Sequence, residues 1–309
     1  MIYDLLIIGG GPAGSAAGVY AARKKLKTLF ITYDFGGQSG VSPNIQNWIG
    51  TKSISGKGLA DNLKEHLLAY AGDALELKER EKVLSIEKTG DGFSVATENG
   101  GDFKTKTLLI ATGADRKKLQ VPGASKFENK GITYCATCDG PLFADMDVVV
   151  IGGGNAGFET AAQLLAYAKS VTLLHRGPEF KADRITVEKV LKNPKMKAIT
   201  NAETKEILGE KFVSGLKYEN LESGEKMELK TNGVFVEIGL IPNTGFVGDL
   251  LEKTQYNQIV ADAKTQRASL PGVWAAGDCA NGLYHQNNIA AGDAVKALED
   301  IYMYLATGD

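Results

Sequence analysis

"IGGGPAG" at residues 8–14 and "IGGGNAG" at residues 151–157 are two nearly identical stretches of this 309-residue chain. Each follows a short apolar run, and each precedes an alanine-rich segment with the residue pattern of a helix. A second apolar run of β type comes after each helical segment, at residues 27–31 and 170–174. A G-x-G-x-x-G turn between a strand and a helix is typical of a βαβ dinucleotide-binding unit. The repeat therefore predicts an α/β fold with two Rossmann-like dinucleotide-binding domains.

The glycines of each turn have separate tasks in such a unit. Gly9 permits the tight turn, Gly11 lets the backbone approach a pyrophosphate, and Gly14 lets the helix pack close to the strand. The helix that follows presents free N–H groups and the positive end of its dipole to the phosphates. An ordinary glycine turn explains a single copy, but two copies in the same context favour two nucleotide sites. The matching glycines of the second copy are Gly152, Gly154 and Gly157.

The residue at the end of the second strand indicates which nucleotide each unit binds. Asp34 lies twenty residues after Gly14, where an acid that binds a ribose hydroxyl is expected. The second copy has His175 and Arg176 at that place, and a basic pair there fits a 2′-phosphate, which favours NADPH. A solvated strand end explains the same two residues, and Glu179 nearby leaves NADH as an alternative donor.

The C-terminal part indicates that one of the two nucleotides is a flavin. "GVWAAGDCA" at residues 272–280 is a β-type run that contains Gly277 and Asp278 at its end. A carboxylate placed there can contact the ribityl chain of a flavin. The apolar pattern of residues 285–299 predicts a helix whose first turn points at the same cofactor. FAD and a nicotinamide dinucleotide are therefore the expected cofactors.

"YCATCDG" at residues 134–140 holds two cysteines at C-x-x-C spacing, followed directly by an acid. A zinc site, a passive crosslink and a redox pair all use this spacing. Zinc needs four ligands, and the chain offers only Cys279 and three histidines, none at matching spacing. A disulfide between residues this close closes too small a loop to stabilise the fold much. The redox pair is therefore favoured, and no metal site is expected.

Composition excludes some partners. The chain is 43% hydrophobic and 23% charged, with a formal net charge of −2, so nothing attracts it to nucleic acid or to an anionic membrane. Residues 5–22 carry no charge, but glycines interrupt them and no basic segment precedes them. We therefore expect no targeting segment, no membrane association, no nucleic-acid partner and a cytoplasmic location.

The whole chain resembles the low-molecular-weight thioredoxin reductases, which are class II pyridine nucleotide-disulfide oxidoreductases. It is also similar to the flavoprotein body of alkyl hydroperoxide reductase. The order and spacing of many motifs carry this resemblance. They are "GGGPAG" (9–14), "FGGQ" (35–38), "NIQNWIG" (44–50), "IATGA" (110–114), "YCATCDGPLF" (134–143), "GGGNAG" (152–157), "HRGPEFKAD" (175–183), "IGLIPNT" (238–244) and "GVWAAGDC" (272–279).

The resemblance implies a fold in which the second dinucleotide-binding domain is inserted into the first. Residues 1–113 and 244–309 would form a discontinuous FAD-binding domain, and residues 114–243 an NADPH-binding domain with the cysteine pair. The connections near residues 113–114 and 240–243 would act as a hinge. The implied activity is FAD-dependent thioredoxin-disulfide reduction by NADPH, in a homodimer.

The resemblance also assigns roles to single residues. Cys138 is expected to face the flavin, Cys135 to attack the partner disulfide, and Asp139 to transfer the proton. The residues expected at FAD are Gly9, Gly11, Pro12, Ala13, Gly14, Asp34, Gly37, Gln38, Asn47, Val83, Ala111, Thr112, Gly113, Gly277, Asp278, His285, Gln286 and Asn287. Those expected at NADPH are Gly152, Gly154, Asn155, Ala156, Gly157, His175, Arg176 and Lys181.

Three positions depart from the thioredoxin reductase pattern. Gly177 replaces a basic residue, Gly157 replaces an alanine, and His285 replaces an arginine. NADH therefore stays an alternative donor. The acceptor has alternatives too: a peroxiredoxin, a glutaredoxin-like carrier or, in an NAD(P)H oxidase, O₂. A flavin- and nucleotide-binding regulatory protein would have no need of the dithiol and its adjacent acid.

Overall fold

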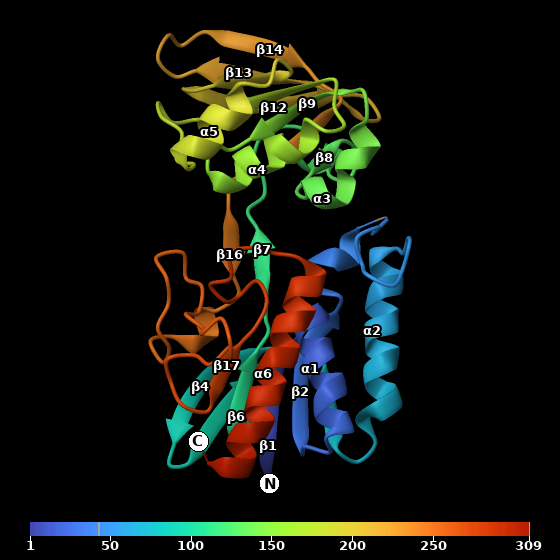
Figure 1. Cartoon of the computed structure of the whole chain (residues 1–309), viewed down its shortest axis with the longest axis vertical. Helices are drawn as coiled ribbons and strands as arrows, with labels where there is room; N and C mark the ends of the chain where they lie inside the picture. Colours follow the sequence, from blue (N-terminus) through green and yellow to red (C-terminus); the bar gives the residue numbers. More distant parts are fainter. Residues whose placement is uncertain (43, 309) are drawn as a thin grey trace. The chain divides into compact units, whose positions relative to one another are not determined.

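The computed structural model describes residues 1–42 and 44–308. It forms two compact units (Figure 1). The first unit comprises Met1–Asp115 and Ile241–Asp309, and the second comprises Arg116–Leu240. The second unit is thus inserted into the first, which confirms the predicted α/β fold with two Rossmann-like domains.

Two short strands form the connections between the units. β7 (Ala114–Arg116) and β16 (Leu240–Pro242) pair with each other in a two-stranded sheet. Pro43 and Asp309, which the predicted FAD-binding domain includes, lie outside the described residues. Among the residues that are described, no helix is both long and apolar enough to cross a membrane.

The first unit is built on a sheet with the strand order β3-β2-β1-β6-β5-β4, and β17 pairs with β6. β1, β2, β3, β6 and β17 pair in parallel, whereas β4, β5 and β6 form an antiparallel meander. Its elements are β1 (Ile2–Gly10), α1 (Pro12–Arg23), β2 (Thr28–Phe35), η1 (Gly37–Val41), α2 (Gly56–Ala71), β3 (Leu75–Glu79), β4 (Val83–Thr89), β5 (Gly92–Thr97), β6 (Asp102–Ile110), η4 (Gly245–Val247), β17 (Val273–Ala275) and α6 (Asn287–Thr307).

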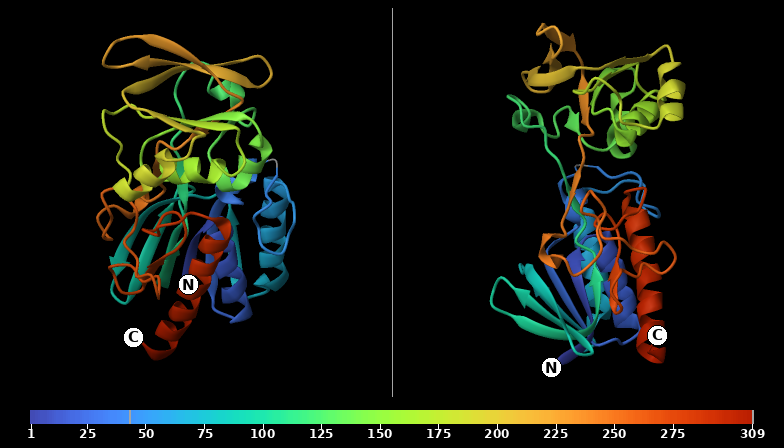
Figure 2. Two further views of the ribbon diagram at one scale, coloured as in Figure 1. Left: turned by 45° about the horizontal axis from the view of Figure 1, so that its top comes forward. Right: turned by 90° about the vertical axis from the view of Figure 1, so that its left-hand side faces the viewer.

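Both faces of this sheet are buried, which explains why residues 5–8 of its central strand β1 are apolar without interruption. Leu5 and Ile7 of β1 belong to a core formed with α1, α2 and α6. Leu6 and Ile8 point to the other face, where they pack with β4, β5 and the segment that leads to β17. Figures 1 and 2 show α1 and α6 beside each other along the sheet. The carboxyl ends of the parallel strands are thereby left for a ligand.

The second unit repeats this plan. Its main sheet has the order β11-β10-β9-β15-β8 and is parallel throughout. α4 and α5 pack on one face, and the antiparallel sheet β12-β13-β14 covers the other. Its elements are η2 (Ser125–Phe127), β8 (Ile132–Thr133), α3 (Ala136–Asp139), η3 (Gly140–Phe143), β9 (Asp147–Ile151), α4 (Asn155–Leu164), β10 (Ser170–Leu174), α5 (Arg184–Leu191), β11 (Met196–Ile199), β12 (Ala202–Gly209), β13 (Val213–Asn220), β14 (Lys226–Lys230) and β15 (Gly233–Val236).

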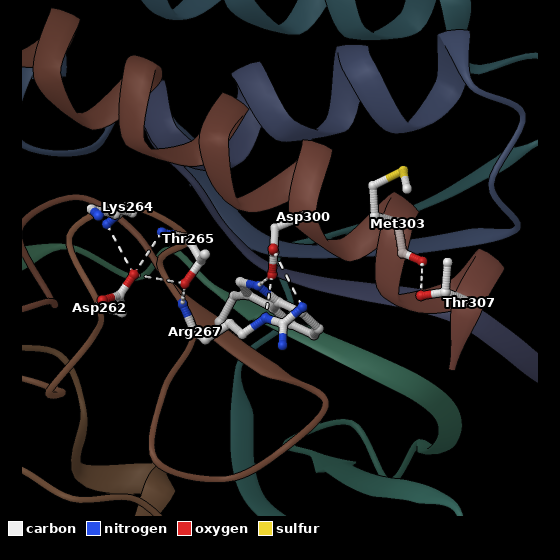
Figure 3. Close-up of polar contacts among 8 residues, drawn as sticks. Asp262, Lys264, Thr265, Arg267, Asp300, Met303 and Thr307 are labelled. Carbon is white, nitrogen blue, oxygen red and sulfur yellow. Dashed lines mark hydrogen bonds and ion pairs between the residues drawn. The ribbon is translucent and has the colours of Figure 1, made fainter. Parts of the chain in front are cut away.

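The C-terminal helix α6 is longer than the predicted helix over residues 285–299 and continues to Thr307. Asp300, two thirds of the way along the helix, fixes it to the loop before β17 (Figure 3). The carboxylate accepts hydrogen bonds from the Arg267 guanidinium and, at 2.8 Å, from the indole N–H of Trp274. The Trp274 side chain is fully buried, so this bond satisfies its polar atom. The segment that contains Asp278 is held against α6 in this way.

Candidate functional site

The cysteine pair lies on a single helical turn. Cys135 and Cys138 are joined by a disulfide, with their Cα atoms 5.3 Å apart. Cys135 is the N-cap residue of α3, and its sulfur accepts a hydrogen bond from the Cys138 N–H at 3.2 Å. A spacing of three residues places both side chains on the same face of a helical turn. Both cysteines of the disulfide are partly exposed.

Asp139 is connected to this pair through Thr133. The Thr133 hydroxyl donates a hydrogen bond to the Asp139 carboxylate. The same hydroxyl accepts one from the Cys135 N–H at 3.4 Å, and the Asp139 N–H donates to the Cys135 carbonyl at 3.0 Å. The acid is therefore held beside the turn that carries both sulfurs.

Burial raises the pKa of Asp139 above that of an ordinary aspartate, although the Thr133 hydrogen bond and the positive charge of Arg116 oppose this. A carboxyl group with a raised pKa holds a proton at a pH at which a free aspartate has lost it. That property suits a group that donates a proton to a thiolate and takes it back.

Arg116 also faces a second buried carboxyl group. Its guanidinium lies 3.6 Å from the Glu237 carboxylate, whose side chain is only 10% exposed. The Thr160 hydroxyl of α4 donates a hydrogen bond to Glu237 at 2.8 Å. Burial raises the pKa of Glu237, while Arg116 and Thr160 lower it. One arginine thus supplies positive charge to two acids of the second unit.

The first glycine turn has the shape that a pyrophosphate requires. Gly9, the penultimate residue of β1, has a φ of 115°, a conformation that favours glycine. A Cβ on Gly14 would overlap the Gly9 carbonyl oxygen, so this glycine allows α1 to pack on β1. A Cβ on Gly11, in contrast, would meet no atom within 4 Å. The space over Gly11 is open, and the predicted task of each glycine fits the geometry.

Segments from distant parts of the sequence converge near this turn. The Gln38 amide donates hydrogen bonds to the Ala114 carbonyl and, at 3.3 Å, to the Asp278 carboxylate. The His285 imidazole lies 3.3 Å from the other Asp278 oxygen. A Cβ on Gly277 would lie 3.3 Å from the Ala13 side chain. The structure thus brings together four of the segments expected to hold FAD.

Other residues expected at FAD divide into two groups. Asn47 donates to Gln286 at 3.1 Å, and Asn287 accepts from Ser39 at 3.0 Å, so both belong to the assembly just described. Val83 lies elsewhere, because it begins β4 and packs in the core on the opposite face of the sheet from α1. Asp34, near the end of β2, is exposed.

The second glycine turn repeats the geometry of the first. Gly152 has a φ of 130°, and a Cβ on Gly157 would overlap the Gly152 carbonyl oxygen. A Cβ on Gly154 would meet nothing within 4 Å. Asn155, at the start of α4, accepts a hydrogen bond from the Asp183 N–H at 2.8 Å. The second unit therefore also leaves the backbone open where a pyrophosphate would approach.

His175 lies against this turn, but it is not the cation that its place beside Arg176 suggests. Burial lowers the pKa of His175, as do the positive charges of Lys181 and Arg176, while a hydrogen bond with the Glu179 backbone raises it. Its Nε2 atom is buried and has no hydrogen-bond partner among the described residues. Since burial of a charged imidazolium nitrogen without a partner is costly, these surroundings favour the neutral form of His175. The side chains of Arg176 and Lys181 are exposed.

Three residues of this arrangement were not predicted from the sequence: Thr133, Arg116 and Glu237. Thr133 could have been found, because residues two apart on an extended strand point to the same side, and Cys135 follows it at that spacing. Arg116 and Glu237 are far apart in the chain and carry no local signal. Cys279 is buried in the first unit, as expected for a small packing residue. Within residues 1–42 and 44–308, no cluster of three or more His, Cys, Asp or Glu residues could hold a metal ion.

Comparisons with known proteins give the same architecture. The pyridine nucleotide-disulphide oxidoreductase family matches residues 3–294. The chain is 40% identical over 303 residues to a protein named NADH dehydrogenase from Bacillus subtilis strain 168. It is 39% identical over 303 residues to a component of alkyl hydroperoxide reductase from Staphylococcus aureus strain NCTC 8325 / PS 47. Each alignment covers 98% of this chain but 58% and 59% of the relatives, so the chain spans less than three fifths of their length.

A solved structure matches along its whole length. The crystal structure of thioredoxin reductase from Streptococcus pyogenes MGAS5005 superposes with a TM-score of 0.89 at 37% sequence identity. The match covers 99% of this chain and 99% of the other.

Proposed function

We propose that this chain, which belongs to the pyridine nucleotide-disulphide oxidoreductase family, is a flavin-dependent disulfide reductase of the thioredoxin reductase type. Electrons would pass from a reduced nicotinamide dinucleotide through FAD to Cys135–Cys138, and then to the disulfide of thioredoxin or a thioredoxin-like protein. The observation that carries this proposal is the partly exposed disulfide with an acid of raised pKa, Asp139, connected to it by Thr133.

The first unit would hold FAD, and the second would hold the nicotinamide dinucleotide. Open space over Gly11 and Gly154 supports both assignments. Gln38, Asp278 and the residues joined to them would hold the flavin in the first unit. When bound, FAD supplies the conversion of a hydride into an electron pair that can be delivered to sulfur.

The chain's own residues would carry out the steps at sulfur. Two electrons break the Cys135–Cys138 bond, and Asp139 gives its proton to one of the two thiolates that form. Cys135 then attacks the partner disulfide as a thiolate, which forms a mixed disulfide and releases one partner thiolate. Asp139 takes its proton back from Cys138, whose thiolate attacks the mixed disulfide, restores the Cys135–Cys138 bond and releases the second partner thiolate. The two partner thiolates take up protons from solvent. Atoms and electrons balance, because the dithiol of Cys135 and Cys138 is oxidised to a disulfide as the partner disulfide is reduced.

We further propose that the protein works as a homodimer in the cytoplasm, as the resemblance to thioredoxin reductases implies. No strong positive charge favours a nucleic-acid partner, since the net charge is −2.

A second candidate function is supported by the names of the relatives. This chain is 40% identical to the protein named NADH dehydrogenase and 39% identical to the component of alkyl hydroperoxide reductase. In this alternative the acceptor is a peroxiredoxin, a glutaredoxin-like carrier or O₂, and the flavin and cysteine residues are the same.

A steady-state comparison of acceptors separates these candidates. The flavin-loaded protein is mixed with NADH or NADPH and with thioredoxin, a peroxiredoxin or oxygen alone, and nucleotide oxidation is followed by absorbance. The proposal predicts that thioredoxin gives the highest kcat/KM. A higher value for the peroxiredoxin, or a rate with oxygen that thioredoxin does not increase, would favour the second candidate.

A further inference from the structure

The end of β10 determines what kind of adenosine ribose the second unit can accept. In a doubly wound sheet the dinucleotide lies across the carboxyl ends of the strands where their order reverses. Here that point lies between β9 and β15, with β10 on the other side of β9. The adenosine half is therefore expected at the end of β10, where His175 follows the strand.

The His175 ring occupies the space in which a second basic side chain would stand. A Cβ on Gly177 would lie 2.8 Å from the His175 Nε2 atom, and a Cβ on Gly153 would also overlap the ring. Tilted packing on Phe180, with ring centroids 5.9 Å apart, holds the imidazole from another side. Gly177 thus offers no side chain to a phosphate, and the neutral ring beside it offers no charge.

The loop after His175 is fixed to the glycine turn by its backbone. The Lys181 N–H donates to the Gly153 carbonyl at 2.8 Å, and the Asp183 N–H donates to the Asn155 side chain at 2.8 Å. Between these points and β10 lies Glu179, whose backbone meets the His175 ring and whose side chain is exposed. The backbone of Glu179 is thereby held next to the strand end, and its carboxylate is free to reach a ligand bound there.

The cations of the loop are partly offset by acids. Arg176 lies close enough to Glu203 to stabilise its ionised form, and Glu203 is also paired with Lys205. A ribose 2′-phosphate carries close to two negative charges at neutral pH, as phosphate monoesters do. It would lie near Glu179, which repels it, with Arg176 and Lys181 as the cations of this segment. A 2′-hydroxyl, in contrast, can donate a hydrogen bond to a carboxylate.

We propose that the second unit selects NADH over NADPH, and that Glu179 and Gly177 determine this choice. The Glu179 carboxylate accepts the hydrogen bond of the ribose 2′-hydroxyl, although this residue lies in the loop and not at the strand end. Gly177 is required because the His175 ring fills the adjacent space. The inference rests on the proposed function only in that the second unit binds the hydride donor.

Equilibrium binding to the flavin-loaded protein tests this without any turnover. The probes are ADP-ribose and 2′-phospho-ADP-ribose, which differ only at the ribose 2′ position, and the measurement is isothermal titration calorimetry. The wild type is expected to bind ADP-ribose about tenfold more tightly, which equals about 1.4 kcal/mol. Glu179→Gln is expected to reduce this ratio severalfold, and Glu179→Asp to keep most of it.

The matched control is Glu210→Gln. β12 begins at Ala202, whose N–H donates a hydrogen bond to the His175 carbonyl, and it ends at Gly209. Glu210 is an exposed acid of the same unit that directly follows this other end of the strand. This variant is expected to leave the binding ratio unchanged. Circular dichroism confirms that each variant is folded before titration.

Equal or tighter binding of 2′-phospho-ADP-ribose by the wild type would overturn the inference, and so would binding of neither probe. An unchanged ratio in Glu179→Gln would overturn the role of Glu179. If ADP-ribose is preferred but no disulfide is reduced with NADH, the selection stands and the proposed reductase function fails. The two failures are therefore distinguishable.

Discussion

Thr133 donates a hydrogen bond to Asp139 while it accepts one from the N–H of Cys135. A single hydroxyl thus connects a carboxyl group of raised pKa to the backbone that carries the disulfide. In the proposed mechanism this connection aligns the proton donor with the sulfur that needs the proton.

Replacing Thr133 with valine tests this connection. The hydroxyl lowers the pKa of Asp139 against the larger effect of burial, so its loss should raise that pKa further. The limb of the pH–rate profile that reports Asp139 should move to higher pH, and kcat should fall about tenfold, since positioned acid–base groups contribute about 10²–10⁴-fold. The control is Thr137→Val. Thr137 lies on the same helical turn as the cysteines, and its exposed hydroxyl donates a hydrogen bond to Gln163 of α4, so its loss should leave the pH–rate profile unchanged. A Thr133→Val profile that coincides with the wild type would exclude the role of Thr133.

Asp139 should lower stability at neutral pH, and Asp139→Asn should relieve this effect. Because its folded-state pKa is raised, the folded protein binds the proton more tightly than the unfolded chain does. The contribution of Asp139 to stability is therefore full below the unfolded pKa and is lost as the pH rises through the folded pKa. Urea unfolding of the disulfide-intact protein at several pH values measures this.

The expected difference has a definite sign. The free energy of unfolding of Asp139→Asn, minus that of the wild type, should become more positive from pH 4 to pH 8. A difference that stays constant or becomes more negative would show that the folded structure does not raise this pKa. Loss of thioredoxin reduction in the same variant is expected in either case.

The first glycine turn allows binding and folding to be separated by two single substitutions. Gly11→Ala adds a methyl group to open space, so the protein should fold with nearly normal stability but retain little FAD. Gly14→Ala forces an overlap with the Gly9 carbonyl and should destabilise the first unit by about 2 kcal/mol or more. Flavin absorbance per protein and urea unfolding of the flavin-free proteins measure the two effects. Full flavin content in Gly11→Ala would contradict the assignment of this turn to the pyrophosphate.

The two Rossmann-like domains could be predicted because their signal is local and written twice. The tight packing at Gly9 and Gly14 could be predicted from backbone sterics alone, and the role of Gly11 at a pyrophosphate stays a prediction. The charge of His175 could not be predicted, since its neutrality depends on burial against Gly153 and Gly177, which only folding produces. The ion pair of Arg116 and Glu237 could not be predicted either. The two residues are far apart in the chain, and they meet only when β15 pairs with β9 in the folded sheet.

The C-terminal boundary of α6 was predicted too early, although the sequence carries the signal for the longer helix. Ile301, Tyr304 and Leu305 continue the apolar spacing of Leu298 and pack against the same core. The bonds from Asp300 to Arg267 and Trp274, in contrast, leave no periodic trace in the sequence.

Trapping of a single-cysteine thioredoxin by Cys138→Ser and Cys135→Ser tests the central claim most directly. Each flavin-loaded variant is mixed with thioredoxin that carries only its attacking cysteine, activated as a mixed disulfide with thionitrobenzoate, and covalent adducts are separated on a non-reducing gel. The account predicts a stable adduct with Cys138→Ser, which keeps Cys135, and little adduct with Cys135→Ser. Both variants should lose turnover, while the reduced nicotinamide dinucleotide still bleaches their flavin. Full thioredoxin turnover in either variant would contradict the account.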